Sequence, residues 1–291
     1  MTLWESHPGR TLHDAENSPI PSHPLTCHTN SVTIRTMESL FSFMDPSGHR
    51  VASALTSPDG DTDKIAVLCH GFLSSKDSST NKTLTRLLSE RGIATFRFDF
   101  FGHGESDGPF EQITNRLAVE QAQAAIDLVR QKGYRRIGLM GSSFGGLVAT
   151  LAAASRTDLA CLALKCPVVD FAEELRLEFG EAEMAKWEST DTVPNIMGGL
   201  DRIALRYAFY EDCLQRIAYE PARSITVPTL IVQGDRDEHI PLHQSQRLYE
   251  ALQVKKRMEI LSGADHQFTK DDDFKRMTTL IADWLTTHLT E

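Results

Sequence analysis

Short apolar runs recur along the chain and are separated by stretches with helical periodicity. Continuous apolar runs of this length are typical of strands that are buried on both faces of a parallel sheet. The runs that predict strands are VTIRT (32–36), HRVASAL (49–55), KIAVLCH (64–70), GIATFRFDF (92–100), RRIGLM (135–140), LACLALKCP (159–167), VPTLIVQG (227–234) and KRMEILSG (256–263).

Helices are predicted between these strands, where apolar residues are spaced three and four positions apart. The expected helices are marked by Leu84, Leu87 and Leu88, by the face that runs from Leu117 to Val129, by residues 144–155, by residues 242–252, and by the stripe from Phe274 to Leu285 behind three acidic residues (271–273). Strands that alternate with helices predict an α/β fold with a mostly parallel, doubly wound sheet.

Two segments interrupt this alternation. Residues 1–30 contain four prolines and four histidines without periodicity, so we expect a flexible N-terminal extension. Residues 168–225 contain helical material and no convincing strand, which predicts a helical cap inserted over one end of the sheet. The core is then expected in two parts, residues 31–167 and 226–291.

Composition narrows the classes of partner and location. The chain has 291 residues and a formal net charge of −10, which argues against binding to nucleic acid. It has no apolar run that approaches the roughly 18 residues of a membrane span, and its N-terminus lacks the apolar core of a secretory signal. The five cysteines include no CxxC pair, and Cys69, Cys161 and Cys166 lie in or beside apolar runs, so these three are expected to be buried free thiols. We therefore expect a cytoplasmic protein with no membrane partner.

A serine lies between glycines in GSSFGG (141–146), directly after a predicted strand and before a predicted helix. A strand–turn–helix of this kind presents a serine hydroxyl beyond the edge of the sheet, and glycines avoid collisions around the tight turn. A serine hydroxyl attacks only when a base removes its proton. Ser143 is therefore the candidate nucleophile, and a base and an orienting acid are required.

The candidate acid and base follow two later strands. Asp235 and Asp237 occur in GDRDEHIP, and His266 occurs in GADHQF. The order Ser, Asp, His, each after its own strand, is the order expected for a triad on this type of sheet. Asp237 lies further into its loop and is the preferred acid, with Asp235 in reserve; Asp265 is interpreted as a loop acid. His266 is the candidate base.

An oxyanion hole requires two backbone N–H donors near the nucleophile. Phe144 follows Ser143 and supplies one candidate donor. In CHGFLSS (69–75), Gly71 allows close approach of the backbone, and Phe72 supplies the second. His70 is expected to brace this loop rather than to transfer protons.

Together these segments resemble the α/β-hydrolase superfamily. HGFLSSKDS, RFDFFGHGESDG, GSSFGG and the pair GDRDEHIP with GADHQF carry the likeness, which covers nearly everything from about residue 40 to the end. The chain is most similar to bacterial cinnamoyl/feruloyl-type esterases, which share a similar RFDF.GHG.SDG stretch and a comparable insertion at residues 168–225. The resemblance implies a serine esterase with a capped acyl pocket and no cofactor, with its nucleophile at Ser143, its acid at Asp237 and its base at His266.

The expected activity is hydrolysis of small acyl or aromatic-acid (cinnamoyl/feruloyl-like) esters through an acyl-enzyme. A serine peptidase or thioesterase with the same triad is the first alternative, and a non-catalytic binding protein on a hydrolase scaffold is the second. A metal-dependent hydrolase is disfavoured because the chain has no HExxH. No metal and no cofactor are expected. The expected partner is a small-molecule ester, and formation of a homodimer is left open.

Overall fold

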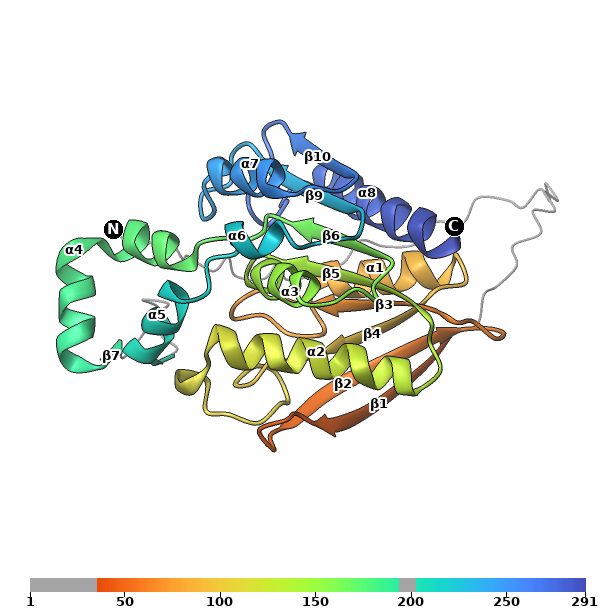
Figure 1. The fold of residues 1–291 in the computed structure, drawn as a ribbon, viewed down its shortest axis with the longest axis horizontal. Helices are drawn as coiled ribbons and strands as arrows, with labels where there is room; N and C mark the ends of the chain where they lie inside the picture. The colour runs from red at the N-terminus through yellow and green to blue at the C-terminus, as the bar shows by residue number, and fades with distance from the viewer. Residues whose placement is uncertain (1–35, 194–202) are drawn as a thin grey trace, which may run out of the picture.

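The computed structural model describes residues 36–193 and 203–291. At its centre is an eight-stranded sheet with the strand order β1-β2-β4-β3-β5-β6-β9-β10 (Figure 1). The six strands from β4 to β10 in this order run parallel, whereas β2 pairs antiparallel with both β1 and β4. The prediction of a mostly parallel α/β sheet is confirmed.

Seven of the eight strands match the apolar runs with shifts of a few residues at their ends, whereas β1 shares only Thr36 with the predicted strand at 32–36 and was not predicted, because most of its residues are exposed and form no apolar run. The strands of the sheet are β1 (Thr36–Met44), β2 (Arg50–Pro58), β3 (Lys64–Cys69), β4 (Ala94–Phe98), β5 (Arg136–Ser142), β6 (Cys161–Lys165), β9 (Thr229–Gly234) and β10 (Lys256–Leu261). The predicted extension at 1–30 and nearly all of the predicted strand at 32–36 lie outside the described residues.

Helices cover both faces of the sheet. They are α1 (Ser79–Ser89), α2 (Asn115–Gln131), α3 (Phe144–Ala154), α4 (Phe171–Thr190), α5 (Tyr207–Leu214), α6 (Tyr219–Ala222), α7 (Leu242–Ala251) and α8 (Asp271–Thr290), with a short 3₁₀ turn at Phe110–Gln112. Buried residues of α2, α3 and α7 share one apolar cluster, and those of α1 and α8 share a second cluster on the opposite face. No helix in the described ranges is both long enough and apolar enough to cross a membrane.

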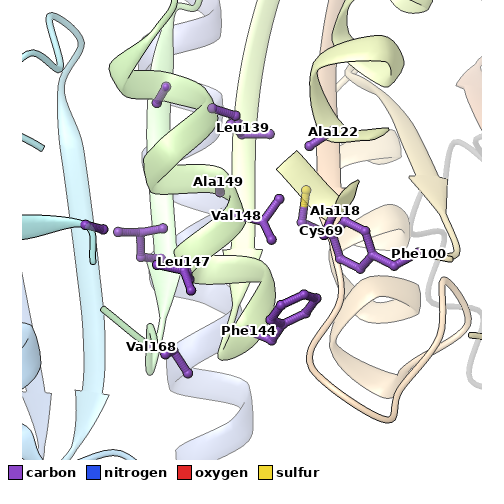
Figure 2. Close-up of a cluster of buried hydrophobic side chains, with 14 of the residues drawn as sticks. Cys69, Phe100, Ala118, Ala122, Leu139, Phe144, Leu147, Val148, Ala149 and Val168 are labelled. Carbon is purple, nitrogen blue, oxygen red and sulfur yellow. The ribbon is translucent and has the colours of Figure 1, made fainter. Parts of the chain in front are cut away.

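The best-buried helix is α3, which packs directly on the centre of the sheet (Figure 2). Phe144, Leu147 and Val148 are fully buried on α3, and Leu139 lies beneath them on β5. Alanines at 149, 152 and 153 complete a helix that is apolar almost all round, which is the pattern of a helix enclosed by protein. This packing holds the start of α3, where the candidate nucleophile lies.

The segment between β6 and β9, called here the insertion (residues 168–225), contains α4, α5 and α6. Helices α4 and α5 project past one end of the sheet (Figure 1). Gly180 has a φ of 68° and interrupts the helical geometry within α4. The assignment of residues 168–225 as a cap domain stays a prediction, and residues 194–202 lie outside the described ranges.

The insertion differs from the prediction in one respect, since it was expected to contain no strand. Two short strands, β7 (Thr192–Val193) and β8 (Leu205–Arg206), pair antiparallel. Each is only two residues long, so the alternation of apolar and polar positions that indicates a strand cannot develop. Their pairing brings together segments that are separated in the chain, and the local pattern does not contain that information.

Candidate active site

Ser143 occupies a strained turn between β5 and α3. Its φ of 53° and ψ of −116° lie in a region that residues with a β-carbon seldom adopt. A β-carbon at Gly141 would lie 2.1 Å from the carbonyl oxygen of Gly145, and one at Gly145 would lie 2.4 Å from that of Cys69. Both glycines are therefore required for α3 to begin so close to β3 and β5. The turn leaves Ser143 partly exposed at the start of the helix.

His266 and Asp237 meet Ser143 at the same edge of the sheet. His266 Nε2 lies 3.2 Å from Ser143 Oγ, and its Nδ1 lies 2.9 Å from each carboxylate oxygen of Asp237. The side chains of His266 and Asp237 are only 6% and 1% exposed. The structure thus brings together the three side chains that the strand order placed at one edge.

Asp237 is held by donors from its own loop and strand. Its Oδ1 accepts the N–H of His239 at 3.0 Å and that of Ile240 at 2.8 Å, and its Oδ2 accepts Gln233 Nε2 at 2.8 Å. Gln233 lies on β9 and is fully buried, so the carboxylate is oriented from behind as well as from the loop. Sequence reasoning did not identify Gln233, although it lies at the end of the strand that leads to the acid.

The reserve acid does not take this position. Asp235 accepts the N–H of Gly263 at 2.6 Å, which ties the β9 loop to the loop after β10. Asp265, which was interpreted as a loop acid, accepts the N–H of Thr269 at 2.9 Å. Asp237 is therefore the carboxylate that reaches His266.

The protonation states of the pair follow from burial and from their mutual contact. Burial raises the pKa of Asp237, but the hydrogen bond and charge of His266 outweigh it and leave the pKa below the usual value. Burial lowers the pKa of His266 by more than Asp237 raises it. At neutral pH the pair is therefore an ionised carboxylate beside a neutral imidazole, and the neutral imidazole can accept a proton.

One candidate oxyanion donor directly follows Ser143 in the chain, and the other belongs to a loop whose backbone approaches Ser143. Phe144 is the first residue of α3, so its N–H has no partner inside the helix. A β-carbon at Gly71 would lie 3.5 Å from Ser143 Cβ, which places the backbone before Phe72 against the nucleophile. The Phe72 ring packs 5.4 Å from Phe144 and 5.3 Å from Phe209 of the insertion.

Two buried histidines brace the loop that carries Phe72, as predicted for His70. His70 Nδ1 donates to the carbonyl of Gly71 at 2.7 Å, while its Nε2 accepts the N–H of Phe100 at 3.1 Å. His103 Nε2 accepts the N–H of Leu73 at 3.1 Å. These bonds require neutral rings, and burial lowers the pKa of His70 to about 4 and that of His103 to about 3.

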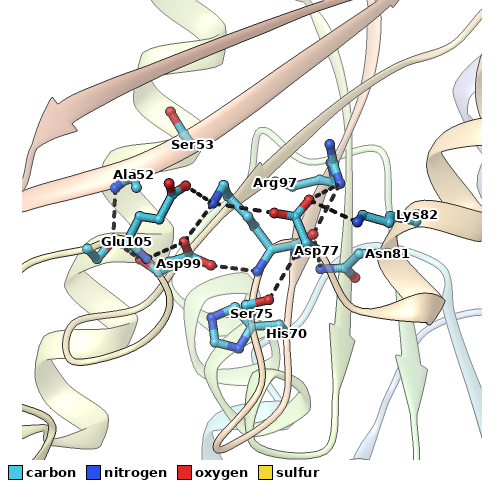
Figure 3. Close-up of polar contacts among 12 residues, drawn as sticks. Ala52, Ser53, His70, Ser75, Asp77, Asn81, Lys82, Arg97, Asp99 and Glu105 are labelled. Carbon is cyan, nitrogen blue, oxygen red and sulfur yellow. Dashed lines mark hydrogen bonds and ion pairs between the residues drawn. The ribbon is translucent and has the colours of Figure 1, made fainter. Parts of the chain in front are cut away.

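A buried ion pair holds the far end of the same loop (Figure 3). The backbone N–H of Lys76 donates to Asp99 Oδ1 at 2.6 Å, and Lys76 Nζ lies 3.0 Å from Asp99 Oδ2. Asp99 also accepts the N–H of Glu105 at 3.0 Å, and the Glu105 carboxylate accepts a hydrogen bond from Lys76 Nζ at 2.5 Å. Asp99 is fully buried, so it links the β3 and β4 loops through one carboxylate.

Two residues at the end of β6 support the base and the acid. Lys165 is buried and donates from Nζ to the carbonyl of His266 at 2.9 Å. Cys166 is also buried, as expected for a free thiol, and its thiol lies within 4.8 Å of the Asp237 carboxylate. Ligand atoms of Cys166, Asp237 and His266 lie within 4.8 Å of one another. Asp237 and His266 already bond to each other, and burial raises the pKa of the Cys166 thiol. This arrangement does not suit a metal.

A pocket lies over Ser143 between the core and α4. Its lining combines aromatic and aliphatic side chains with a few polar groups from the insertion and the β9 loop. The lining residues are Phe72, Leu73, Ser143, Val168, Phe171, Glu174, Leu175, Glu178, His239, Ile240, His266 and Gln267. Phe171, Glu174, Leu175 and Glu178 have the spacing of one helical face, so their periodicity carried a signal that sequence reasoning left unused.

Known proteins are similar to this chain over most of its length. An uncharacterised 31.7 kDa protein from the traX-finO intergenic region of Escherichia coli is 24% identical over 276 residues, covering 82% of this chain and 96% of that protein. The serine hydrolase BPHL of Homo sapiens is 22% identical over 220 residues, covering 71% and 74%. A structure of Est1E from Butyrivibrio proteoclasticus with bound ferulic acid has a TM-score of 0.76 at 23% identity, covering 86% of this chain and all of that one. The structural likeness supports the fold.

The family assignment comes from a model of the whole family. The model described as the alpha/beta hydrolase family matches residues 66–274, which include the strand–turn–helix at Ser143 and the loops of Asp237 and His266. Because this match covers well over half of the chain, the protein belongs to the alpha/beta hydrolase family.

Proposed function

We propose that the protein is a serine-dependent carboxylic ester hydrolase that acts through an acyl-enzyme. The observation that carries the proposal is the continuous chain of contacts from Asp237 through His266 to Ser143 Oγ. It combines an ionised acid, a neutral base and a hydroxyl at the start of a buried helix. Est1E, whose structure contains ferulic acid, and the serine hydrolase BPHL are consistent with this reaction class.

In the proposed first step, His266 Nε2 accepts the proton of Ser143 as Oγ attacks the ester carbonyl. Asp237 keeps the Nδ1 proton in place and stabilises the imidazolium that forms. The N–H groups of Phe72 and Phe144 receive the negative charge that develops on the carbonyl oxygen, each contributing about 3 kcal/mol to transition-state stabilisation.

In the second step the tetrahedral adduct collapses. His266 gives its proton to the departing alcohol, and an ester bond remains between the acyl group and Ser143. His266 then removes a proton from water, which attacks this ester; as the bond to Oγ breaks and the carboxylic acid leaves, His266 returns the proton to Ser143 Oγ. The aromatic lining from Phe72 and Phe171 favours small acyl groups or aromatic acids of the cinnamoyl type.

The test is the change Ser143→Ala, assayed on p-nitrophenyl esters and on methyl ferulate. We expect the variant to lose at least about 1,000-fold in kcat/KM, because it lacks the hydroxyl that contacts His266 Nε2. Its midpoint in urea unfolding should stay near that of the parent. Retained turnover, or labelling of a different residue by a fluorophosphonate, would overturn the proposal. Faster cleavage of matched thioesters or aminoacyl amides would instead favour a thioesterase or a peptidase.

A further inference from the structure

The wall that α4 contributes to the pocket over Ser143 carries two acidic side chains. Glu174 and Glu178 lie one turn apart on α4, and both line the same pocket as Ser143. The rest of that helical face, Phe171 and Leu175, is apolar. Glu178 is exposed, whereas Glu174 is buried, and a buried carboxyl group is costly and calls for a physical explanation.

Glu174 is buried without a complete set of partners. The residue is 9% exposed, and its Oε2 is buried with no hydrogen-bond partner among the residues that the structure describes. Burial raises the pKa of Glu174 well above its usual value, and the charge and hydrogen bonding of Glu178 raise it further. A buried acceptor left without a donor costs about 1–3 kcal/mol, and a ligand that supplies the donor recovers that energy.

The groups that face Glu174 do not supply the missing donor. Glu178 adds a second carboxyl from α4. The Cys213 thiol of α5 has a pKa that is raised by burial and further by the charge of Glu174. His239 and His266 reach the pocket from the β9 and β10 loops. Within the described ranges, no lysine or arginine lines the pocket.

The nearest charged side chains on α4 are already engaged with other groups. Arg176 donates to the hydroxyl of Tyr210 at 3.0 Å, and Glu173 contacts His243 Nε2 at 3.0 Å. The α4 wall of the pocket therefore carries two carboxyl groups, one of which has a buried oxygen without a donor in the part of the chain that the structure describes.

We propose that Glu174 and Glu178 form a subsite for a primary ammonium group on the ester that is cleaved at Ser143. The inference rests on the proposed ester hydrolase function. An ammonium group donates a hydrogen bond to Glu174 Oε2, and its charge stabilises the ionised form of a carboxyl whose pKa is raised by burial and by Glu178. A hydroxyl group supplies only the hydrogen bond, and a carboxylate group is repelled. The preferred substrates are thus cationic esters of modest size.

The kinetic test compares matched esters that differ in one terminal group. Each ester carries an ammonium, a hydroxyl or a methyl group at the end of its acyl or its alcohol chain, at three chain lengths. For the best chain length we expect kcat/KM for the ammonium ester to exceed that for the methyl ester by at least about tenfold. Glu174→Gln should bring this ratio close to one, mainly by raising KM, and Glu178→Gln should reduce it less.

The matched control is Glu181→Gln, which removes the same charge from an exposed position on the same helix outside the pocket. Its ratio should equal that of the parent. Equal ratios in the parent, Glu174→Gln and Glu181→Gln would overturn the proposal. An equal preference for hydroxyl and ammonium esters over methyl esters would also overturn it, because the subsite would then select a neutral donor.

A binding measurement separates failure of the subsite from failure of the proposed function. Intact ammonium and methyl esters are titrated into the full-length Ser143→Ala protein by calorimetry, with and without Glu174→Gln. We expect the second change to weaken binding of the ammonium ester at least about tenfold and to leave the methyl ester nearly unaffected. If the parent hydrolyses no ester while this difference is present, the esterase proposal fails and the subsite stands. If esters are hydrolysed without this difference, the subsite fails.

Discussion

At the scale of single residues, the site depends on which of two neighbouring acids faces the base. Asp237 contacts His266 and accepts hydrogen bonds from N–H groups of its own loop, whereas Asp235 accepts the backbone N–H of Gly263. The two acids are two positions apart and chemically identical, so only their loop geometry distinguishes them. The same geometry leaves His266 buried, and burial determines the pH at which it can act.

The lowered pKa of His266 predicts the acidic limb of the pH profile. A general base works only when neutral, so kcat/KM should rise with pH and level off above the pKa of the free enzyme. Because burial lowers that pKa, the midpoint should lie below the ordinary histidine value of 6.5. The measurement is kcat/KM for a neutral ester between pH 4 and pH 8. A midpoint above pH 7 would contradict the assignment of His266 as base.

The choice of acid gives a separate prediction. Asp237→Asn should lower kcat by about 10,000-fold, because an amide cannot hold the required tautomer of His266 or stabilise its charged form. Asp235→Asn is the matched control, with the same chemical change two residues away, and it should keep kcat within about threefold. A large loss of kcat in Asp235→Asn with normal activity in Asp237→Asn would reverse the assignment.

At the scale of elements, the loops after β3 and β4 behave as one unit. The buried pair of Lys76 and Asp99 joins them near one end, and His70 and His103 join them beside Phe72. The candidate oxyanion donor Phe72 therefore depends on contacts that lie several residues away along its loop. Removing one member of a buried pair leaves an uncompensated charge, which is more damaging than removing both.

Lys76→Met should test this connection. We expect it to lower the free energy of unfolding by about 3–5 kcal/mol, because Asp99 loses its buried counter-ion. We also expect kcat to fall while KM changes little, because the loop of Phe72 loses its anchor. Lys82→Met is the control: Lys82 is 62% exposed and lies 3.8 Å from Asp77, so its change should cost less than about 1 kcal/mol. Urea unfolding and ester kinetics are the measurements, and similar results for the two variants would contradict the argument.

At the scale of the whole molecule, buried neutral histidines link the fold to pH. His70 and His103 have folded-state pKa values of about 4 and about 3, whereas an unfolded chain has a value near 6.5. The unfolded state therefore binds more protons between these values, and stability must fall as the pH falls below about 6.5. By pH 5 the loss should be about 2 kcal/mol for each histidine.

Urea unfolding at pH 7 and pH 5 measures this loss. His103→Gln keeps a side chain of similar polarity that does not titrate, so its stability should fall by about 2 kcal/mol less than that of the parent over the same range. Identical losses in the two proteins would show that His103 does not contribute to the acid sensitivity.

Much of this protein is determined by local sequence pattern. Apolar runs predicted seven of the eight strands of the main sheet, all except the mostly exposed β1, and the glycines around Ser143 predicted the tight turn, because strand burial and backbone collisions act over a few residues. The order of the serine, the acid and the histidine then predicted their meeting at one edge, since parallel strands end on the same side of a sheet.

The tertiary structure alone decided the rest. Segments that are distant in the chain determine the pairing of β7 with β8 and the burial of Glu174 in the pocket. They also determine the hydrogen bonds from the Gly263 N–H to Asp235, from Gln233 to Asp237 and from Lys165 to the His266 carbonyl. Burial and hydrogen-bond partners are properties of the space around a side chain, and a side chain acquires them only when the chain has folded.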